Sequence, residues 1–254
     1  MIVNAITPNL VARDRVAKQP VVTGLALDGA NLSGITARVM RDGQPLDSVA
    51  GHVKAATDSG YFADRTWLTQ LDAVFAQMYF DTMDTWHAGR TGEVPKAWQV
   101  ALKASDDRSM TGLGDFLLNM NAHINNDFPH ALATVGLTAA DGTSHKPDHN
   151  AYNQRLDSLY VPVFDEEAER FDPTFDDYDV GPLDDAGVGT IMRGWREMVW
   201  RHAENLVTAK TPLQKQVAER AIEEYAASQA AMIRATFASL DKSTARDAYC
   251  EARG

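Results

Sequence analysis

A short segment of the chain concentrates polar side chains that could carry acid–base or metal chemistry. Within NMNAHINNDFPHAL, residues 119–132, His123 and Asp127 stand four residues apart. On a helix this spacing puts an imidazole and a carboxylate on one face, where they could ligate a metal ion or act as an acid–base pair. Amides crowd the same segment, although Asn is a poor helix-interior residue. An exposed face or structural hydrogen-bond network, a metal site and a metal-free polar pocket are the three explanations that the pattern leaves open.

Apolar side chains in the same region keep helical spacing, so we predict a helix over residues 110–135. Pro129 lacks an amide proton and should kink this helix near Asn125 and Asn126. A polar stripe runs along one side of the predicted helix, formed by Asp115, Asn119, His123, Asp127 and His130. We expect the side chains of His123 and Asp127 to turn inward, toward a cavity shared with other helices.

A second carboxylate, Asp72, falls at the apolar stripe of a helix predicted over residues 62–88. Such a carboxylate should be paired with a cation, bound to a metal, or raised in pKa by burial. The alternative is a rim position, where an arginine pairs with it. Tyr79 lies on the same stripe and could shape an apolar cavity.

The helix predicted over residues 186–208 carries His202 within its apolar stripe. A histidine there is either a satisfied core residue, or a ligand or general base. Arg196 flanks this face and could neutralise Asp72 or Asp127, or clamp an anionic substrate.

A further candidate pair lies in DHNAYNQ, residues 148–154. Asp148 suits the N-cap of a helix that we predict over residues 148–170. His149 and Asn153, four residues apart on that helix, could face the same interior as His123.

The remaining sequence must supply the elements that position these groups. We predict an all-α fold: a single-domain bundle of about six to eight helices over residues 46–254, with an irregular N-terminal arm, residues 1–45, packed on it. The arm is rich in Gly, Asn and Pro and reads as loops with short extended pieces. Pro95 should open a short helix in its first turn, and Thr211 should cap a helix that begins at Pro212. Further helices are predicted over residues 95–105, 212–239 and 242–250.

Composition and charge limit the kinds of partner, cofactor and location that we expect for this chain. The net charge of −11 and the lack of a basic run argue against nucleic acid. No long apolar window and no secretory signal are present, so we expect no membrane span and a cytoplasmic location. The chain has one cysteine, Cys250, and lacks GxGxxG and GxxxxGK[ST] motifs, so no nucleotide or flavin is expected. The acidic run over residues 165–185 is interpreted as a solvated loop or a lid.

The order of segments resembles a bacterial family of uncharacterised helical proteins, one of the domains of unknown function. The resemblance covers about residues 45–210, and NAHINND is its most specific part. The other matching pieces are LDAVFAQMYF (71–80), the aromatic residue in PKAWQVAL, LLNMNAHINNDFPHAL (117–132), DHNAYNQ (148–154) and GWREMVWRHAENL (194–206). The resemblance implies no activity. It marks Asp72, Asn121, His123, Asn125, Asp127, Asn153, Trp195 and Arg196 as positions typical of that family.

AHINNDFPHAL is also somewhat similar to a helix of zinc-dependent phospholipase C and the single-strand nucleases that share its all-α fold. Those proteins carry HxxxD followed by a proline and another histidine. This chain lacks a second clear HxxxD or HxxxE motif, so the resemblance implies at most a site with one or two metal ions.

Two kinds of enzyme and a binding protein are consistent with these residues. The first hypothesis is a metal-dependent, hydrolase-like enzyme acting on a small molecule, with Zn, Fe or Mn held by His123, Asp127 and His202. The second is a metal-free biosynthetic cyclase, isomerase or lyase with His123 and Asp127 as acid–base pair; the third is a non-catalytic small-molecule binder. The catalytic candidates are His123, Asp127, Asp72 and Arg196, and the substrate-binding candidates are Asn121, Asn125, Asn153, Tyr79 and Trp195.

Overall fold

The computed structural model describes two short strands, Met40–Arg41 and Gln44–Pro45, residues 59–157 and 182–238, and the single positions 248 and 252. Most of the predicted N-terminal arm, most of the acidic run, the second half of the helix predicted over residues 148–170, most of the helix predicted over residues 242–250, and Cys250 lie outside the described residues.

Helices dominate the described residues, and the all-α prediction is confirmed. The α-helices are α4 (Arg65–His87), α5 (Lys96–Asp107), α6 (Gly112–Asn121), α7 (Phe128–Val135), α8 (Lys146–Asp157), α10 (Pro182–Thr208) and α11 (Pro212–Phe237). A 3-10 turn, η2 (Thr91–Glu93), precedes α5, and a π-helical segment, η3 (Ala122–Asp127), joins α6 to α7. The two strands pair antiparallel, with Met40 opposite Pro45 and Arg41 opposite Gln44. No helix among the described residues has the length and apolar character needed to cross a membrane.

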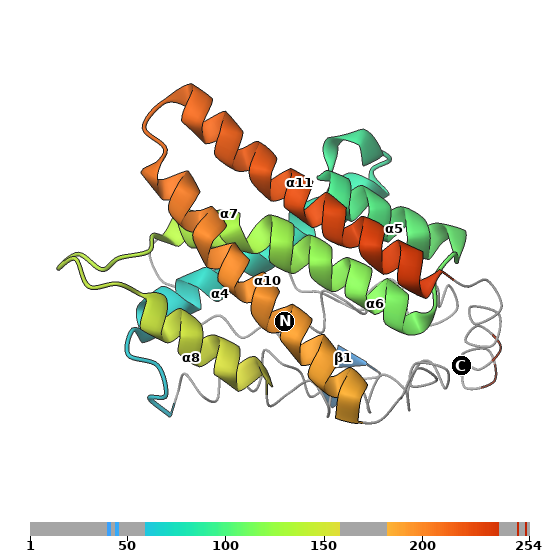
Figure 1. Ribbon diagram of the computed structural model, residues 1–254, viewed down its shortest axis with the longest axis horizontal. Coiled ribbons are helices and arrows are strands. Elements are labelled where there is room, and N and C mark those ends of the chain that lie inside the picture. Colours follow the sequence, from blue (N-terminus) through green and yellow to red (C-terminus); the bar gives the residue numbers. More distant parts are fainter. Residues whose placement is uncertain are drawn as a thin grey trace.

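The segment α6–η3–α7 runs through the middle of the bundle (Figure 1). Its π-helical part contacts four helices: α4, α5, α10 and α11. The long helices α10 and α11 form an antiparallel pair over one side of it, and α4 and α5 approach from the others. All six residues of the π-helical segment are buried, including the polar side chains of His123, Asn125, Asn126 and Asp127.

The proline in the middle of this segment explains its irregular geometry. Pro129 has no amide proton to donate to the carbonyl of Asn125, so a regular α-helical ladder is interrupted there. The Phe128 N–H instead bonds the carbonyl of His123, five residues back. The irregularity predicted near Asn125 and Asn126 thus takes the form of a π-helical segment. Such segments recur at functional sites.

Local capping chemistry sets where several helices begin. Thr211 caps α11 through a capping box with Gln214, and Pro212 is in the first helical turn, as predicted. Pro95 is the N-cap residue of α5 rather than its first helical residue, which corrects the predicted start by one position. Helix α8 begins at Lys146, whose N–H bonds the Ser144 hydroxyl, so Asp148 is not its N-cap.

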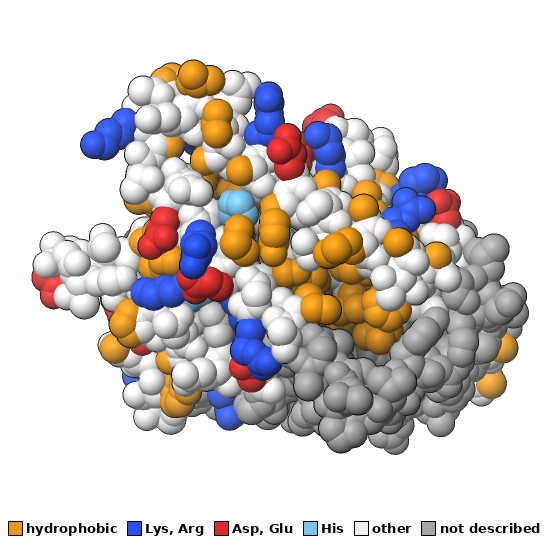
Figure 2. Space-filling model, viewed as in Figure 1, with side chains coloured by type: hydrophobic (Ala, Val, Ile, Leu, Met, Phe, Trp, Pro, Cys, Tyr) orange, Lys and Arg blue, Asp and Glu red, His pale blue; other side chains and the backbone are white. Residues whose placement is uncertain are grey.

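The outer face of the bundle is mixed in character. On the face drawn in Figure 2, positive and negative side chains lie close together with hydrophobic side chains between them. Three of the most exposed large apolar residues lie at the turn between α10 and α11: Val207, Leu213 and Val217.

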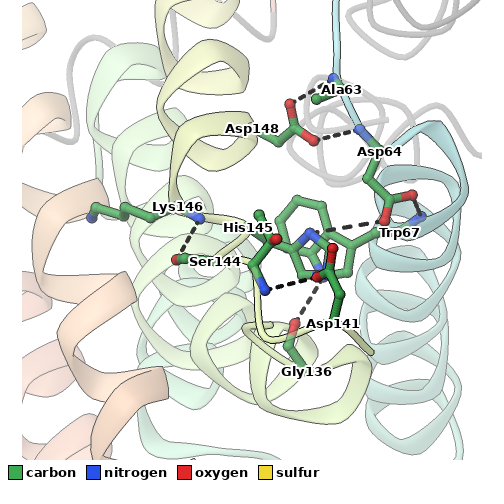
Figure 3. Close-up of polar contacts among 10 residues, drawn as sticks. Ala63, Asp64, Trp67, Gly136, Asp141, Ser144, His145, Lys146 and Asp148 are labelled. Atoms are coloured by element: carbon green, nitrogen blue, oxygen red, sulfur yellow. Dashed lines mark hydrogen bonds and ion pairs between the residues drawn. The ribbon is translucent and has the colours of Figure 1, made fainter. Parts of the chain in front are cut away.

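Asp148, which does not cap α8, connects that helix to the start of α4 (Figure 3). Its two carboxylate oxygens accept hydrogen bonds from the backbone N–H groups of Ala63, at 2.8 Å, and Asp64, at 2.7 Å. The Asp64 carboxylate in turn caps α4 by accepting from the Trp67 N–H. The imidazole of His145 stacks on the Trp67 indole at 4.5 Å between ring centroids. These contacts fix the position along the bundle of the helix that carries Asp72 and Phe75.

Candidate acid–base site

His123 and Asp127 form a buried, directly bonded pair in the π-helical segment. The two side chains are 1% and 5% exposed, and His123 Nδ1 lies 3.0 Å from Asp127 Oδ2. Two further donors bond the same carboxylate: Trp98 Nε1 to Oδ2 and Asn126 Nδ2 to Oδ1, both at 2.8 Å. An ionised carboxylate only accepts hydrogen bonds, so Nδ1 of His123 carries the proton in this arrangement. Nε2 is then unprotonated and carries the lone pair that can accept a proton.

Aromatic rings enclose the imidazole of His123. The Phe75 ring lies parallel to it at 3.6 Å between centroids, and the rings of Tyr79 and Trp98 stand at 5.8 and 6.0 Å. Burial lowers the pKa of His123, and the hydrogen bond that His123 donates to Asp127 opposes this shift. A neutral imidazole with a fixed tautomer is the form that serves as a general base.

Asp72 lies on α4 one turn before Phe75, which places it near the same aromatic cluster. It is partly exposed, and burial raises the pKa of its carboxyl to about 6. No described Lys or Arg forms an ion pair with Asp72, so the predicted alternative of an arginine partner finds no support there. The charge of Asp72 also contributes to raising the pKa of the buried Tyr152 phenol, after the larger effect of burial. Burial raises the pKa of Tyr79 as well, so both phenols stay protonated at neutral pH.

The predicted metal ligands do not assemble into one set. His202 contacts the ring of Tyr225 at 5.4 Å, and neither nitrogen of its imidazole has a hydrogen-bond partner. The described residues contain no group of three or more His, Cys, Asp or Glu side chains arranged to hold a metal ion. Both oxygens of Asp127 already accept hydrogen bonds. One of these bonds comes from His123 Nδ1, so the two predicted ligands bond each other. The described residues therefore do not bring the three predicted ligands together, and metal binding stays a prediction.

The asparagines of the segment differ in what they bond. Asn121 Nδ2 donates to the carbonyl of Ala226 in α11, which links the end of α6 to that helix. Asn125 Nδ2 donates to Asn121 Oδ1, but Asn125 Oδ1 is buried without a partner. Of these two predicted substrate-binding residues, Asn125 is the one whose side chain keeps a hydrogen-bond acceptor available for a substrate.

Two predicted site residues on α10 connect helices to one another. Arg196 forms an ion pair with Asp157 at 2.7 Å and donates to the backbone carbonyl of Asn153 at 2.9 Å. It therefore pairs with neither Asp72 nor Asp127. Trp195 Nε1 donates to Gln229 Oε1 across the α10–α11 contact.

A second buried histidine lies close to the aromatic cluster. His149 packs against Phe128 and Trp200, at 6.0 and 5.0 Å between ring centroids. Its Nδ1 lies 3.3 Å from Asn153 Nδ2, which confirms that this pair shares one side of α8. Burial, together with the positive charge of Lys146, lowers the pKa of His149 to about 3.

Residues 47–236 match a family model described as a family of unknown function, DUF5995. This chain belongs to the DUF5995 family. The matched region includes every candidate site residue described above. No curated protein and no solved structure matches the chain, so the sequence likeness to zinc-dependent phospholipase C gains no structural support.

Two residues of this candidate site could not be identified from the sequence patterns. Phe75 and Trp98 occupy apolar positions of α4 and α5, and periodicity marks both as core residues. Their contacts with His123 and Asp127 depend on how the helices cross. For Trp98 the available signal was an indole N–H on a fully buried face, because such a group needs an acceptor.

Proposed function

We propose that this protein is a metal-free acid–base enzyme of the isomerase, cyclase or lyase type, acting on a small and largely apolar molecule. The hydrogen bond from His123 Nδ1 to an Asp127 carboxylate, itself held by Trp98 and Asn126, is the observation that supports it most directly. In this arrangement the carboxylate orients the imidazole and stabilises the imidazolium formed when a proton is taken up.

The proposed reaction moves protons between the substrate and two side chains. Nε2 of His123 takes a proton from the substrate and becomes charged next to Asp127. Asp72, with a pKa of about 6, is partly protonated near neutral pH and returns a proton to another atom of the substrate. Because Asp72 is partly exposed, it can regain a proton from water, while His123 releases one, and the site returns to its starting state.

The metal-dependent hydrolase is the less well supported hypothesis. A metal held by His123 and Asp127 would require the carboxylate to give up hydrogen bonds from a buried indole and a buried amide. An unpaired buried donor costs about 1–3 kcal/mol, so that rearrangement opposes metal binding.

The test follows substrate conversion in a metabolite extract of the organism that encodes the protein. Wild-type protein, dialysed against EDTA and assayed for bound metal, is incubated with the extract in ²H₂O and analysed by mass spectrometry. We expect a compound to be converted and to gain deuterium from the solvent. Asp127→Asn should slow this conversion by about 10²- to 10⁴-fold, because the tautomer of His123 is no longer fixed.

His202→Gln is the matched control, since it alters a buried histidine outside the pair and should leave conversion unchanged. Stoichiometric metal that is lost in His123→Gln, together with activity lost on chelation, would support the metal-dependent hypothesis instead. A compound that is retained by the protein but never converted would identify a binding protein.

A further inference from the structure

Two buried polar atoms on α8, one on His149 and one on Asn153, have no hydrogen-bond partner among the described residues. His149 Nε2 and Asn153 Oδ1 are both buried without a hydrogen bond, although the two side chains lie 3.3 Å apart at Nδ1 and Nδ2. Nearly all buried polar atoms in folded proteins are hydrogen-bonded, and an unpaired one costs about 1–3 kcal/mol. Two such atoms on neighbouring side chains therefore call for a partner that the described residues do not supply.

The pair offers the same chemistry whichever way its protons are arranged. If Asn153 donates to Nδ1, then Nε2 of His149 carries a proton and donates, while Asn153 Oδ1 accepts. If the amide is turned over, Nδ1 carries the proton, Nε2 accepts, and Asn153 Nδ2 donates. In both states the pair keeps one donor and one acceptor without a partner among the described residues.

Charges around the pair are already balanced. Arg196 is paired with Asp157 at 2.7 Å, and Lys146 is paired with Glu197 at 2.8 Å. His149 itself is neutral at physiological pH, because burial lowers its pKa. The pair is consequently suited to a neutral group rather than an anion.

Aromatic contacts join the pair to the acid–base site. Phe128 contacts His149 on one side and Phe75 on the other, with 6.0 and 4.6 Å between ring centroids. Phe75 stacks directly on His123. Two aromatic rings thus lie between His149 and the imidazole of His123.

We propose that His149 and Asn153 form a recognition subsite for the polar end of the substrate, a neutral group with a donor beside an acceptor, such as a carboxamide or lactam. This inference rests on the proposed function and adds the substrate class. The apolar body of the substrate lies along Phe128 and Phe75, and its reacting atom reaches His123.

The test uses benzamide as the probe on full-length protein labelled with ¹⁵N in histidine. We expect millimolar benzamide to shift the ring-nitrogen resonances of His149 saturably and to leave those of His202 unchanged. Benzoate, which is charged at neutral pH, should produce a smaller shift at equal concentration. The same response should be retained in His123→Gln, because the subsite does not depend on the acid–base pair.

Two variants keep the result interpretable. Asn153→Leu should weaken the benzamide response of His149 at least tenfold. The double variant His149→Phe/Asn153→Leu replaces both partners by apolar groups and should stay folded, as measured by circular dichroism. Benzamide should change the fluorescence of the neighbouring Trp200 in wild-type protein and leave it unchanged in this double variant.

Three results would overturn the subsite. They are no shift at His149 with benzamide in the wild-type protein, an undiminished shift in Asn153→Leu, and tighter binding of benzoate than of benzamide. Loss of conversion in His123→Gln with an intact benzamide response concerns the acid–base proposal alone. Conversion that persists without any His149 response refutes the subsite alone.

Discussion

At the scale of single residues, the buried carboxylate of Asp127 organises the site. It accepts hydrogen bonds from side chains on two helical elements: Trp98 of α5, and His123 and Asn126 of the π-helical segment. The carboxylate thereby fixes which nitrogen of His123 is free. Removing any one of its donors should change both the free energy of unfolding and the tautomer of His123.

Trp98→Phe removes one donor while keeping an aromatic ring in place. Because the lost hydrogen bond goes to a buried charged group, we expect the free energy of unfolding to fall by about 1.5–3 kcal/mol. Urea unfolding measures this loss, and ¹⁵N chemical shifts report whether Nδ1 of His123 keeps its proton. Trp195→Phe is the control: it removes a part-buried hydrogen bond to the neutral Gln229 and should cost less. Equal losses in the two variants would contradict the special role of Asp127.

Asp72→Asn should change how stability depends on pH. The carboxyl has a pKa of about 6 in the folded protein and about 4 when unfolded. The folded state therefore binds the proton more tightly, and the stability this confers is complete below about pH 4 and lost as pH rises through 6. At pH 7 the variant should be more stable than wild type by up to about 3 kcal/mol, and by less where solvent screens the charge.

Urea unfolding at a series of pH values checks this difference, which should shrink toward zero below about pH 4. Asp84→Asn, on the exposed face of the same helix, is the matched control. A stability difference that stays constant between pH 4 and 7 would show that Asp72 is not perturbed by burial.

At the scale of secondary-structure elements, periodicity locates most of the helices but not their inner irregularity. The helix predicted over residues 62–88 is α4, Arg65–His87, because a single apolar stripe faces the core along its length. The capping residues Thr211 and Pro212 fix the start of α11 to the residue. The π-helical segment could not be read from spacing, since one proline can be accommodated by a kink, a break or a wider turn.

The second feature that the sequence could not predict at this scale is which residues on different helices contact each other. Arg196 could be recognised as a cation on a core-facing helix, but its pairing with Asp157 depends on where α8 meets α10. His123 and Asp127 were predictable as neighbours because four residues separate them on one element. Trp98 joins them from a different helix, and contacts of that kind need the tertiary structure.

Two glycines on different helices make a matched test of close packing. A Cβ added at Gly114 in α6 would lie 2.6 Å from Phe237 Cβ and 2.8 Å from Met110 Cε, whereas one at Gly194 in α10 would meet nothing within 4 Å. Alanine favours a helix over glycine by about 1 kcal/mol. We therefore expect Gly194→Ala to raise the free energy of unfolding by up to about 1 kcal/mol and Gly114→Ala to lower it by about 1–3 kcal/mol. Thermal and urea unfolding measure both; stabilisation by Gly114→Ala would show that the end of α11 does not press on α6.

At the scale of the whole molecule, helices far apart in sequence are held together by a few polar contacts around the large apolar core. Such contacts join Asp148 of α8 to the start of α4, and Asn121 at the end of α6 to α11. Since α4 carries both Asp72 and Phe75, its position along the bundle decides whether the acid–base site can form.

Asp148→Ala tests how firmly α8 holds α4. The variant leaves the Ala63 and Asp64 N–H groups without their acceptors, and both hydrogen bonds are to a charged group. We expect the free energy of unfolding to fall by roughly 2–3 kcal/mol. The amides of Ala63 and Asp64 should exchange with solvent faster than in wild type, and the ring resonances of His123 should shift because Phe75 stacks on that imidazole. Hydrogen exchange and ¹⁵N spectra of histidine-labelled protein measure the two effects.

Asp141→Asn, which alters an exposed carboxylate that bonds only locally, to Thr143, is the control and should leave both unchanged. A destabilised Asp148→Ala protein with an unaltered His123 spectrum would mean that the site keeps its geometry without this connection, and that the core contacts of α4 alone position Asp72 and Phe75.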